Sequence, residues 1–309
     1  MPIVRRMVIG DEKYVESGGL RLWTERFGDR DDPCVLLVMG TSTQAIGWPD
    51  DLVARLVRSG RQVIRFDHRD TGRSDCVDFG ANPYTLADMA ADALAVLDGH
   101  DVDRAHVVGL SLGGAIGQWL AVHHEARVRT LTAIMTSPMG NNAGPAWARA
   151  MAGQPAAPNE LPPPSPRFLR HVVDSAQVPR ATPEQRVDAD LRTWRMLNGD
   201  VLPFDEPAAR RFVELSHQRA HNPAAAGNHD LAGRRFTAER LVPLSSITAP
   251  TLVVHGSEDP IFATAHAEAL AAQVPYARLH VIEGMGHNLF SPGLPERIAD
   301  LIADHTAAR

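Results

Sequence analysis

The chain has 309 residues and a formal net charge of −6. Apolar residues make up 44% of it and charged residues 22%, which excludes wholesale disorder, collagen-like repeats and coiled coils. The negative balance and the lack of a block of Lys and Arg argue against a nucleic-acid partner.

Apolar runs are far shorter than the roughly 20 residues that a membrane-spanning helix needs, so no membrane partner is expected. The first residues contain no apolar segment of the kind found in secretory signals. The two cysteines, Cys34 and Cys76, are too few for a disulfide framework or a four-cysteine zinc site. Together these features predict a cytoplasmic protein.

Strand and helix patterns alternate along most of the chain. Residues 20–27 alternate apolar and polar side chains, as a half-exposed strand does. Later strands are short apolar runs, typical of parallel strands covered on both faces. Strands are expected at 20–27, 35–39, 62–66, 105–109, 128–136, 251–255 and 278–282, with helices at 49–59, 86–98 and 113–123. This order predicts an α/β fold with a mostly parallel, doubly wound sheet.

The alternation is interrupted in the middle of the chain. Residues 138–207 hold 12 of the 23 prolines, a density that breaks regular elements and would suit a disordered linker. The same region also carries aromatic residues and helical patterns at 184–197 and 208–220, which disordered segments lack. We therefore expect a helical, proline-rich cap at residues 138–243, inserted into a core formed by residues 1–137 and 244–309.

A nucleophile motif follows the strand expected at 105–109. Gly109-Leu110-Ser111-Leu112-Gly113 matches G-x-S-x-G, in which the serine stands on a sharp turn between a strand and a helix. Side chains two residues either side of the serine would collide across so sharp a turn, so glycine suits both places. The alternative is an ordinary turn between a strand and a helix.

A serine hydroxyl is a weak nucleophile until a base takes its proton and a third group orients that base. Asp259 and His287 each lie in a turn directly after an expected strand, at the sheet edge where α/β folds place their sites. The order Ser111, Asp259, His287 is the one expected for hydrolases with such a motif. Glu258, beside Asp259, remains an alternative acid.

Transition-state stabilisation requires two donors for the oxyanion. The backbone N–H of Leu112, the residue after the serine, would supply one. The other is expected from the loop after the strand at 35–39, with Thr41 as the donor and Gly40 allowing close approach.

Aromatic residues of the insertion would either line an apolar substrate pocket or form a small core of their own. The substrate-contact candidates are Gly40, Trp147, Trp194 and Phe204, with Phe168 as a further aromatic neighbour. His217 and His221 have helical i, i+4 spacing, but no Glu follows His217 as in H-E-x-x-H, so no metal site is expected. Asp67 to Asp70 more closely suit a structural network of ion pairs than an acid–base pair.

These motifs resemble the α/β-hydrolase superfamily, including its D-x-R-x-x-G-x-S loop in the run Asp67 to Ser74. More narrowly, the segments 37–40, 47–49, 67–74, 105–111 and 194–197 are similar to the aclacinomycin methylesterase group, bacterial esterases that act on a polyketide methyl ester. The resemblance implies a serine hydrolase with a helical cap and a small-molecule ester as substrate.

The expected chemistry is ester cleavage through an acyl-enzyme, with neither metal nor organic cofactor. The same three residues could instead serve carbon–carbon bond hydrolysis or cofactor-free perhydrolysis. A receptor that keeps the fold without catalysis is the alternative outside enzymes. Because the aromatic residues of the insertion lack an accompanying charged cluster, we expect a largely apolar, uncharged ester. The sequence does not specify an oligomeric state.

Overall fold

A computed structural model of the chain describes residues 10–141, 143–235 and 242–307. The predictions that fall on residues 1–9, 142, 236–241 and 308–309 lie outside the described residues. One is the prediction that the first residues contain no secretory signal. The other is the part of the expected cap at residues 236–241.

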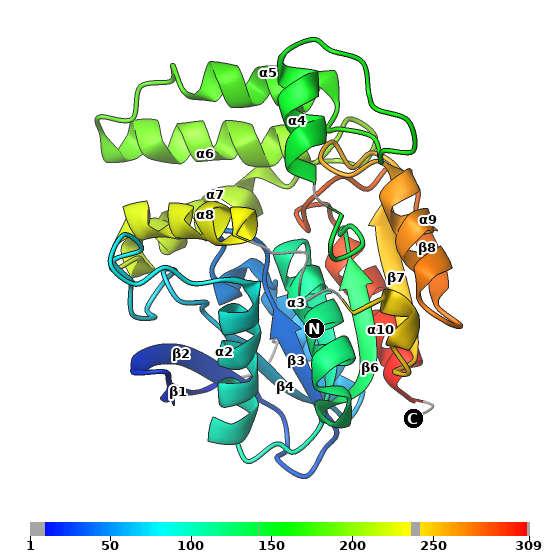
Figure 1. Cartoon of the computed structure of the whole chain (residues 1–309). Coiled ribbons are helices and arrows are strands. Elements are labelled where there is room, and N and C mark those ends of the chain that lie inside the picture. The colour runs from blue at the N-terminus through cyan, green and yellow to red at the C-terminus, as the bar shows by residue number, and fades with distance from the viewer. Residues whose placement is uncertain (1–9, 142, 236–241, 308–309) are drawn as a thin grey trace, which may run out of the picture.

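One mixed sheet forms the centre of the described structure (Figure 1). Its strands lie in the order β1-β2-β4-β3-β5-β6-β7-β8, and β2 is antiparallel to both β1 and β4, while the other neighbours are parallel. The prediction of a mostly parallel sheet is confirmed. The strands are β1 (Asp11–Ser17), β2 (Leu20–Phe27), β3 (Cys34–Val38), β4 (Gln62–Phe66), β5 (Ala105–Leu110), β6 (Val128–Ile134), β7 (Thr251–Gly256) and β8 (Arg278–Ile282).

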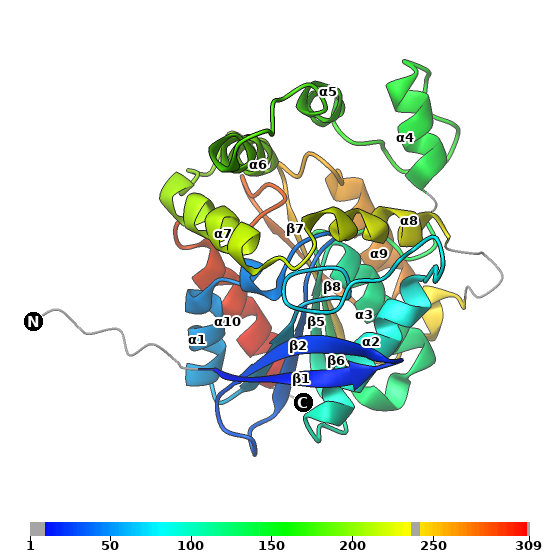
Figure 2. The ribbon, with the colours of Figure 1, turned by 90° about the vertical axis from the view of Figure 1, so that its left-hand side faces the viewer.

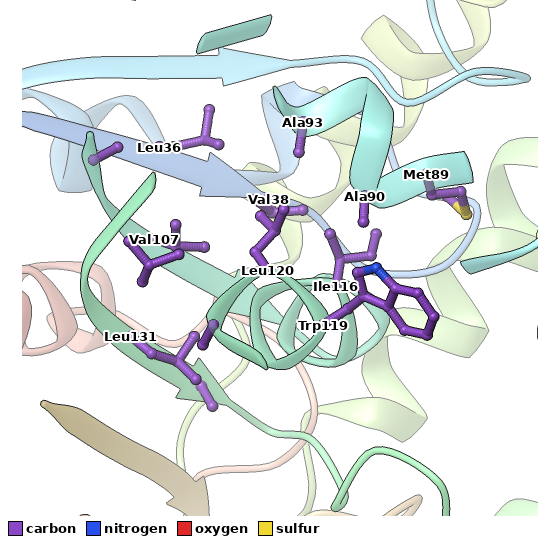
Figure 3. Close-up of a cluster of buried hydrophobic side chains, with 14 of the residues drawn as sticks. Leu36, Val38, Met89, Ala90, Ala93, Val107, Ile116, Trp119, Leu120 and Leu131 are labelled. Atoms are coloured by element: carbon purple, nitrogen blue, oxygen red, sulfur yellow. The ribbon is translucent and has the colours of Figure 1, made fainter. Parts of the chain in front are cut away.

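Helices cover both faces of this sheet (Figure 2). Apolar side chains of α2, α3 and α9 pack on one face, and those of α1 and α10 pack on the other. Figure 3 shows part of the core between the sheet, α2 and α3, where Ile116 of α3 lies near Val38 of β3 and Ala90 of α2. These helices are α1 (Asp50–Arg58), α2 (Leu86–Gly99), α3 (Leu112–His123), α9 (Thr264–Gln273) and α10 (Leu294–Ala307).

The sequence did not predict strand β1. Its residues are mostly exposed and polar, with Val15 and Ser17 as its buried side chains, so no apolar alternation marks it. It is one of the two edge strands and is held by antiparallel pairing with β2, from Asp11 opposite Arg26 to Ser17 opposite Leu20. Pairing with β2 therefore makes a strand of a segment whose own sequence has no strand pattern.

The chain between β6 and β7 is largely helical in its described part. Prolines begin several of these helices: Pro166 and Pro183 occupy the first turn, after the capping side chains of Ser165 and Thr182. Proline suits this position because the first helical N–H has no partner within the helix. The helices are α4 (Ala143–Met151), α5 (Pro166–Ser175), α6 (Pro183–Leu197), α7 (Glu206–Arg219) and α8 (Asn228–Arg234).

These helices lie beyond the end of the sheet toward which the arrowheads of β3 and β6 point (Figure 1). That end is where the loops carrying the candidate residues emerge.

Short 3₁₀ helices connect several elements: η1 (Ala45–Gly47), η2 (Glu125–Arg127), η3 (Pro223–Gly227) and η5 (Leu244–Ser246). None of the described helices is long and apolar enough to cross a membrane.

Candidate active site

Ser111 stands at the junction of β5 and α3 in a strained conformation. Its φ is 54° and its ψ is −116°, and left-handed φ is uncommon for a residue with a side chain. Neighbouring glycines make the turn possible: a Cβ on Gly109 would lie 2.0 Å from the carbonyl oxygen of Gly113, and one on Gly113 would lie 2.1 Å from that of Val38. The turn therefore has the geometry expected of a nucleophile elbow.

Hydrogen bonds hold the Ser111 backbone in this position. Its N–H donates to the carbonyl oxygen of Ile134 at 2.9 Å, and its own carbonyl oxygen accepts from the hydroxyl of Thr136 at 2.8 Å. Leu112 is the first residue of α3, so its N–H belongs to the helix N-terminus, where partial positive charge collects. Such a group suits the predicted role of Leu112 as an oxyanion donor.

Asp259 and His287 contact each other although 28 residues separate them. Nδ1 of His287 lies 2.6 Å from Oδ2 of Asp259, and both residues are buried, with 7% and 8% of their surfaces exposed. The other carboxylate oxygen of Asp259 accepts the N–H groups of Ile261 (2.8 Å) and Phe262 (2.9 Å). With its proton on Nδ1, the imidazole presents Nε2 as a base.

The environment keeps Asp259 ionised. Burial acts to raise the pKa of this carboxyl, but the neighbouring His287, His255 and the N–H of Phe262 outweigh it and hold the pKa below its usual value. Glu258, the alternative acid, is exposed. Because Asp259 contacts His287, the geometry favours Asp259 over Glu258.

A second buried histidine, His255, lies at the end of β7 and was missed by the sequence reasoning because it is inside a strand. Its Nε2 donates to the carbonyl oxygen of Phe262 at 2.8 Å and lies 3.7 Å from Oδ2 of Asp259. Burial lowers the pKa of this imidazole, so it is neutral at ordinary pH. It fixes the same turn that positions Asp259.

The loop of His287 is held by helix α6. The N–H of His287 donates to the carbonyl oxygen of Leu197 at 2.6 Å, and the side chain of Asn288 donates to that of Trp194 at 2.8 Å. A Cβ on Gly286 would lie 2.2 Å from the Leu197 oxygen, so this close approach requires glycine. The insertion therefore contacts the backbone of the candidate base directly.

The predicted oxyanion loop lies beside the elbow. A Cβ on Gly40 would be 3.3 Å from the Cβ of Ser111, which shows how closely the two backbones approach. Thr41 is exposed, and the Gly40 carbonyl oxygen accepts from the N–H of Thr43 at 3.3 Å. Carbonyl and N–H point opposite ways in a trans peptide. The N–H of Thr41 therefore points away from Thr43, and its role as a donor stays a prediction.

The aromatic candidates fall into two groups. Trp194 and Phe204 join a cluster with Phe212 of α7 and Phe290, which follows the His287 loop; the ring centres of Trp194 and Phe290 are 5.2 Å apart. Trp147 packs edge-on against Phe168 at 5.6 Å, in a second cluster that Trp194 also joins. Much of this aromatic surface is therefore used in packing of the insertion.

Two aromatic neighbours of the site were missed by the sequence reasoning. Phe290 packs with the Trp194 cluster, and the ring centre of Phe262 is 5.8 Å from that of His287. Both stand within three residues of Asp259 or His287 in the sequence. Their nearness in sequence to Asp259 and His287 is the feature that could have identified them.

The Asp67 to Asp70 segment is a structural network, as predicted. Asp67 is buried and accepts from the backbone N–H of Ala45 (2.8 Å) and of Arg73 (3.0 Å), and from the guanidinium of Arg219 (2.8 Å). Arg219 is the last residue of α7, so this ion pair ties the insertion to the sheet edge.

Removing one partner of a buried ion pair leaves the other charge without compensation. We expect Arg219→Ala to lower the free energy of unfolding by about 3 kcal/mol. Arg167→Ala is the matched control: Arg167 pairs with Asp200 on the exposed surface of the insertion, and its loss should cost less than about 1 kcal/mol. Urea unfolding of the three proteins measures both values. Equal losses would contradict the account of the Asp67 pair.

His217 lies in α7, whereas His221 lies beyond the end of that helix, so the predicted helical spacing of the two does not hold. His217 pairs with Asp190 at 2.7 Å, and the backbone N–H of His221 donates to the carbonyl oxygen of Gly72. Within the described ranges, no cluster of three or more His, Cys, Asp or Glu side chains is suited to a metal ion.

Comparison with known proteins places the chain in a family. Residues 33–294 match the model of the alpha/beta hydrolase fold family. The chain is 39% identical over 303 residues to a rhodomycin D methylesterase from Streptomyces peucetius and 38% identical to another from Streptomyces sp. (strain C5), with 98% of each chain covered in both cases. It is also similar to the solved structure of a hydrolase from Pseudomonas aeruginosa PA01 (TM-score 0.68, 26% identity, 96% of this chain and 98% of that chain).

The chain therefore belongs to the alpha/beta hydrolase fold family. The fold and the family resemblance predicted from the sequence are confirmed.

Proposed function

We propose that this chain is a serine hydrolase that cleaves the methyl ester of an apolar, polyketide-type small molecule. The observation that carries the proposal is the buried Asp259–His287 pair, whose carboxylate and imidazole are 2.6 Å apart. Ser111, on the elbow between β5 and α3, is the nucleophile that we propose for this pair. The near full-length similarity to two rhodomycin D methylesterases supports the choice of a methyl ester.

In the proposed reaction, Oγ of Ser111 attacks the acyl carbon while Nε2 of His287 accepts the hydroxyl proton. The N–H groups of Thr41 and Leu112 stabilise the oxyanion. The bond to the methoxy oxygen breaks, and His287 returns the proton so that methanol leaves. Water then attacks the acyl-serine with the same base, releasing the carboxylic acid and restoring Ser111. Every atom and proton is accounted for without a metal or organic cofactor.

The insertion, residues 138–243, is proposed to act as a lid that sets the choice of ester. Its support is the contact of α6 with the His287 loop and of α7 with Asp67. Trp194 and Phe204 would present their remaining exposed surface to an apolar substrate, and Trp147 would do so further out. Small-molecule pockets usually have such apolar walls.

Other reactions of the same three residues are carbon–carbon bond hydrolysis and perhydrolysis. A panel of esters graded in acyl length and alcohol size, run beside a polyketide methyl ester and a vinylogous diketone, tests the assignment. We expect the methyl ester to have the highest kcat/KM. A preference for the diketone, or binding of the ester without turnover, would overturn the proposed function.

Replacing Trp194 tests the lid. We expect Trp194→Ala to lower kcat/KM about tenfold or more for a bulky polyketide methyl ester, because about 2 kcal/mol of apolar contact is lost. Its effect on p-nitrophenyl acetate should stay within about threefold, since acetate hardly fills the pocket. The ratio of the two kcat/KM values is the measurement. An equal loss on both esters would contradict the lid and indicate general damage to the His287 loop.

A cytoplasmic location is also part of the proposal. Cys34 and Cys76 are both free thiols, and Cys34 is buried, as suits a reducing compartment.

A further inference from the structure

The turn that carries the proposed oxyanion donor Thr41 contains a residue in an unusual conformation. The N–H of Thr43 donates to the carbonyl oxygen of Gly40, so Thr41 and Ser42 are the two central residues of a tight turn. Ser42 has a φ of 57°. A second central residue with positive φ is normally Gly or Asn, and a residue with a Cβ is disfavoured there by about 1–2 kcal/mol.

Two hydrogen bonds from the insertion hold Ser42 in this conformation. Its backbone N–H donates to Nδ1 of His229 in α8 at 2.9 Å. Its hydroxyl donates to the carbonyl oxygen of Ala226 in η3 at 2.7 Å. Residues 226 and 229 are about 185 positions away along the chain, so the turn depends on a tertiary contact.

His229 is well fixed for this task. It is 1% exposed, and its Nε2 lies 2.9 Å from the carbonyl oxygen of Arg69. A carbonyl can only accept, so the proton is on Nε2, which leaves Nδ1 as the acceptor that the Ser42 N–H needs. Burial lowers the pKa of this imidazole, which favours the neutral ring.

A second histidine fixes the preceding peptide. Nε2 of His68 donates to the carbonyl oxygen of Met39 at 3.0 Å, and the rings of His68 and His229 pack edge to face at 5.6 Å. The two imidazoles thus hold the peptides on both sides of Gly40 and Thr41: His68 acts from the core and His229 from the insertion.

We infer that His229 is a positioning residue, through which the docked insertion sets the left-handed turn at Ser42 and thereby aims the Thr41 N–H at the oxyanion. This inference rests on the proposed function, because it takes Thr41 as the donor. Without the Nδ1 acceptor, Ser42 is no longer held at positive φ, and the turn closed by the Gly40–Thr43 hydrogen bond loses its support. Opening of that bond releases the Gly40–Thr41 peptide, which carries the donor N–H of Thr41. Docking of the insertion then becomes a condition for efficient catalysis as well as for substrate choice.

Two replacements of His229 separate its two hydrogen bonds. Asn places an acceptor near the position of Nδ1, and Gln places a donor near that of Nε2. We expect His229→Gln to lower kcat on p-nitrophenyl acetate about 10- to 100-fold with KM within about threefold, since a displaced oxyanion donor affects the transition state most. His229→Asn should stay within about fivefold of the wild type.

Glycine at position 42 gives the sharpest readout, because it adopts positive φ without help. We expect Ser42→Gly, combined with His229→Gln, to restore kcat to within about fivefold of the wild type. Ser42→Val, a β-branched change at an exposed residue, should reproduce the loss while His229 is intact. If circular dichroism shows that His229→Gln does not fold, Ser42→Val alone tests whether the conformation of Ser42 controls kcat.

Equal losses in the Asn and Gln variants, a change in KM alone, or no rescue by glycine would overturn the inference and leave His229 as a docking contact. Failure of the proposed function looks different, because a Ser111→Ala protein would then retain ester hydrolysis. If hydrolysis depends on Ser111 while kcat is unchanged in His229→Gln and Ser42→Val, the positioning role of His229 is contradicted.

Discussion

Ser111→Ala should remove ester hydrolysis, lowering kcat by roughly 10⁴- to 10⁶-fold, while the protein stays folded. Alanine has the same backbone preferences as serine at a φ of 54°, so the strain of the elbow is unchanged. The residual rate would come from binding and from the oxyanion donors. Initial rates on p-nitrophenyl acetate, with circular dichroism as a check on folding, measure the effect.

The chain offers a matched control in a second serine–histidine pair. The hydroxyl of Ser137 lies 2.8 Å from Nδ1 of His266, whose Nε2 donates to the carbonyl oxygen of Pro162. Ser137 immediately precedes the insertion and His266 lies in α9 of the core. The imidazole has no carboxylate behind it, so we expect Ser137→Ala to change kcat by less than about threefold. Full activity in Ser111→Ala, or a comparable loss in Ser137→Ala, would contradict the assignment of Ser111.

Asp259→Asn should lower kcat about 10⁴-fold at neutral pH. An amide can donate to Nδ1 of His287, which moves the imidazole proton to Nε2 and leaves no base facing Ser111. Glu258→Gln, one residue earlier and exposed, is the control and should be nearly neutral. A large loss from Glu258→Gln together with a small one from Asp259→Asn would make Glu258 the acid.

The same substitution has a consequence for stability in acid. Because the pKa of Asp259 is lower in the folded protein than its usual value of about 3.9, its ionised form stabilises the fold above that value. This contribution is lost as the pH falls through the folded-state pKa. The difference in unfolding free energy between the wild type and Asp259→Asn should therefore be constant near neutrality and shrink below about pH 4, as urea unfolding at several pH values would show.

Most of the core could be predicted from the sequence because its strands are short, largely apolar segments that alternate with helical patterns. The strands at 62–66 and 278–282 were predicted with their observed ends, and the helix at 86–98 was one residue short. β1 could not be predicted, since its polar residues are ordered by pairing with β2 rather than by their own pattern.

The candidate catalytic residues were accessible from the sequence for a different reason. Ser111, Asp259 and His287 each follow a predicted strand, and parallel strands bring their carboxyl ends to one edge. The positions of His229 and Arg219 were not accessible, because their partners Ser42 and Asp67 lie more than 150 residues away and no periodicity records such contacts. The aromatic residues of the insertion are an intermediate case. Their type suggested a pocket or a core, and only the structure shows that Trp194 packs in two clusters, one with Phe290 and one with Trp147.

Titration with a fluorophosphonate, which labels activated serines, tests whether Ser111 is the nucleophile. Ser111 and Ser137 fall in different tryptic peptides, residues 105–127 and 130–149, so mass spectrometry distinguishes the two. We expect one adduct per chain, carried by the peptide 105–127, with ester hydrolysis falling in proportion to labelling. A fully labelled protein that still hydrolyses esters, or an adduct on any other peptide that accompanies the loss of activity, would contradict this role of Ser111.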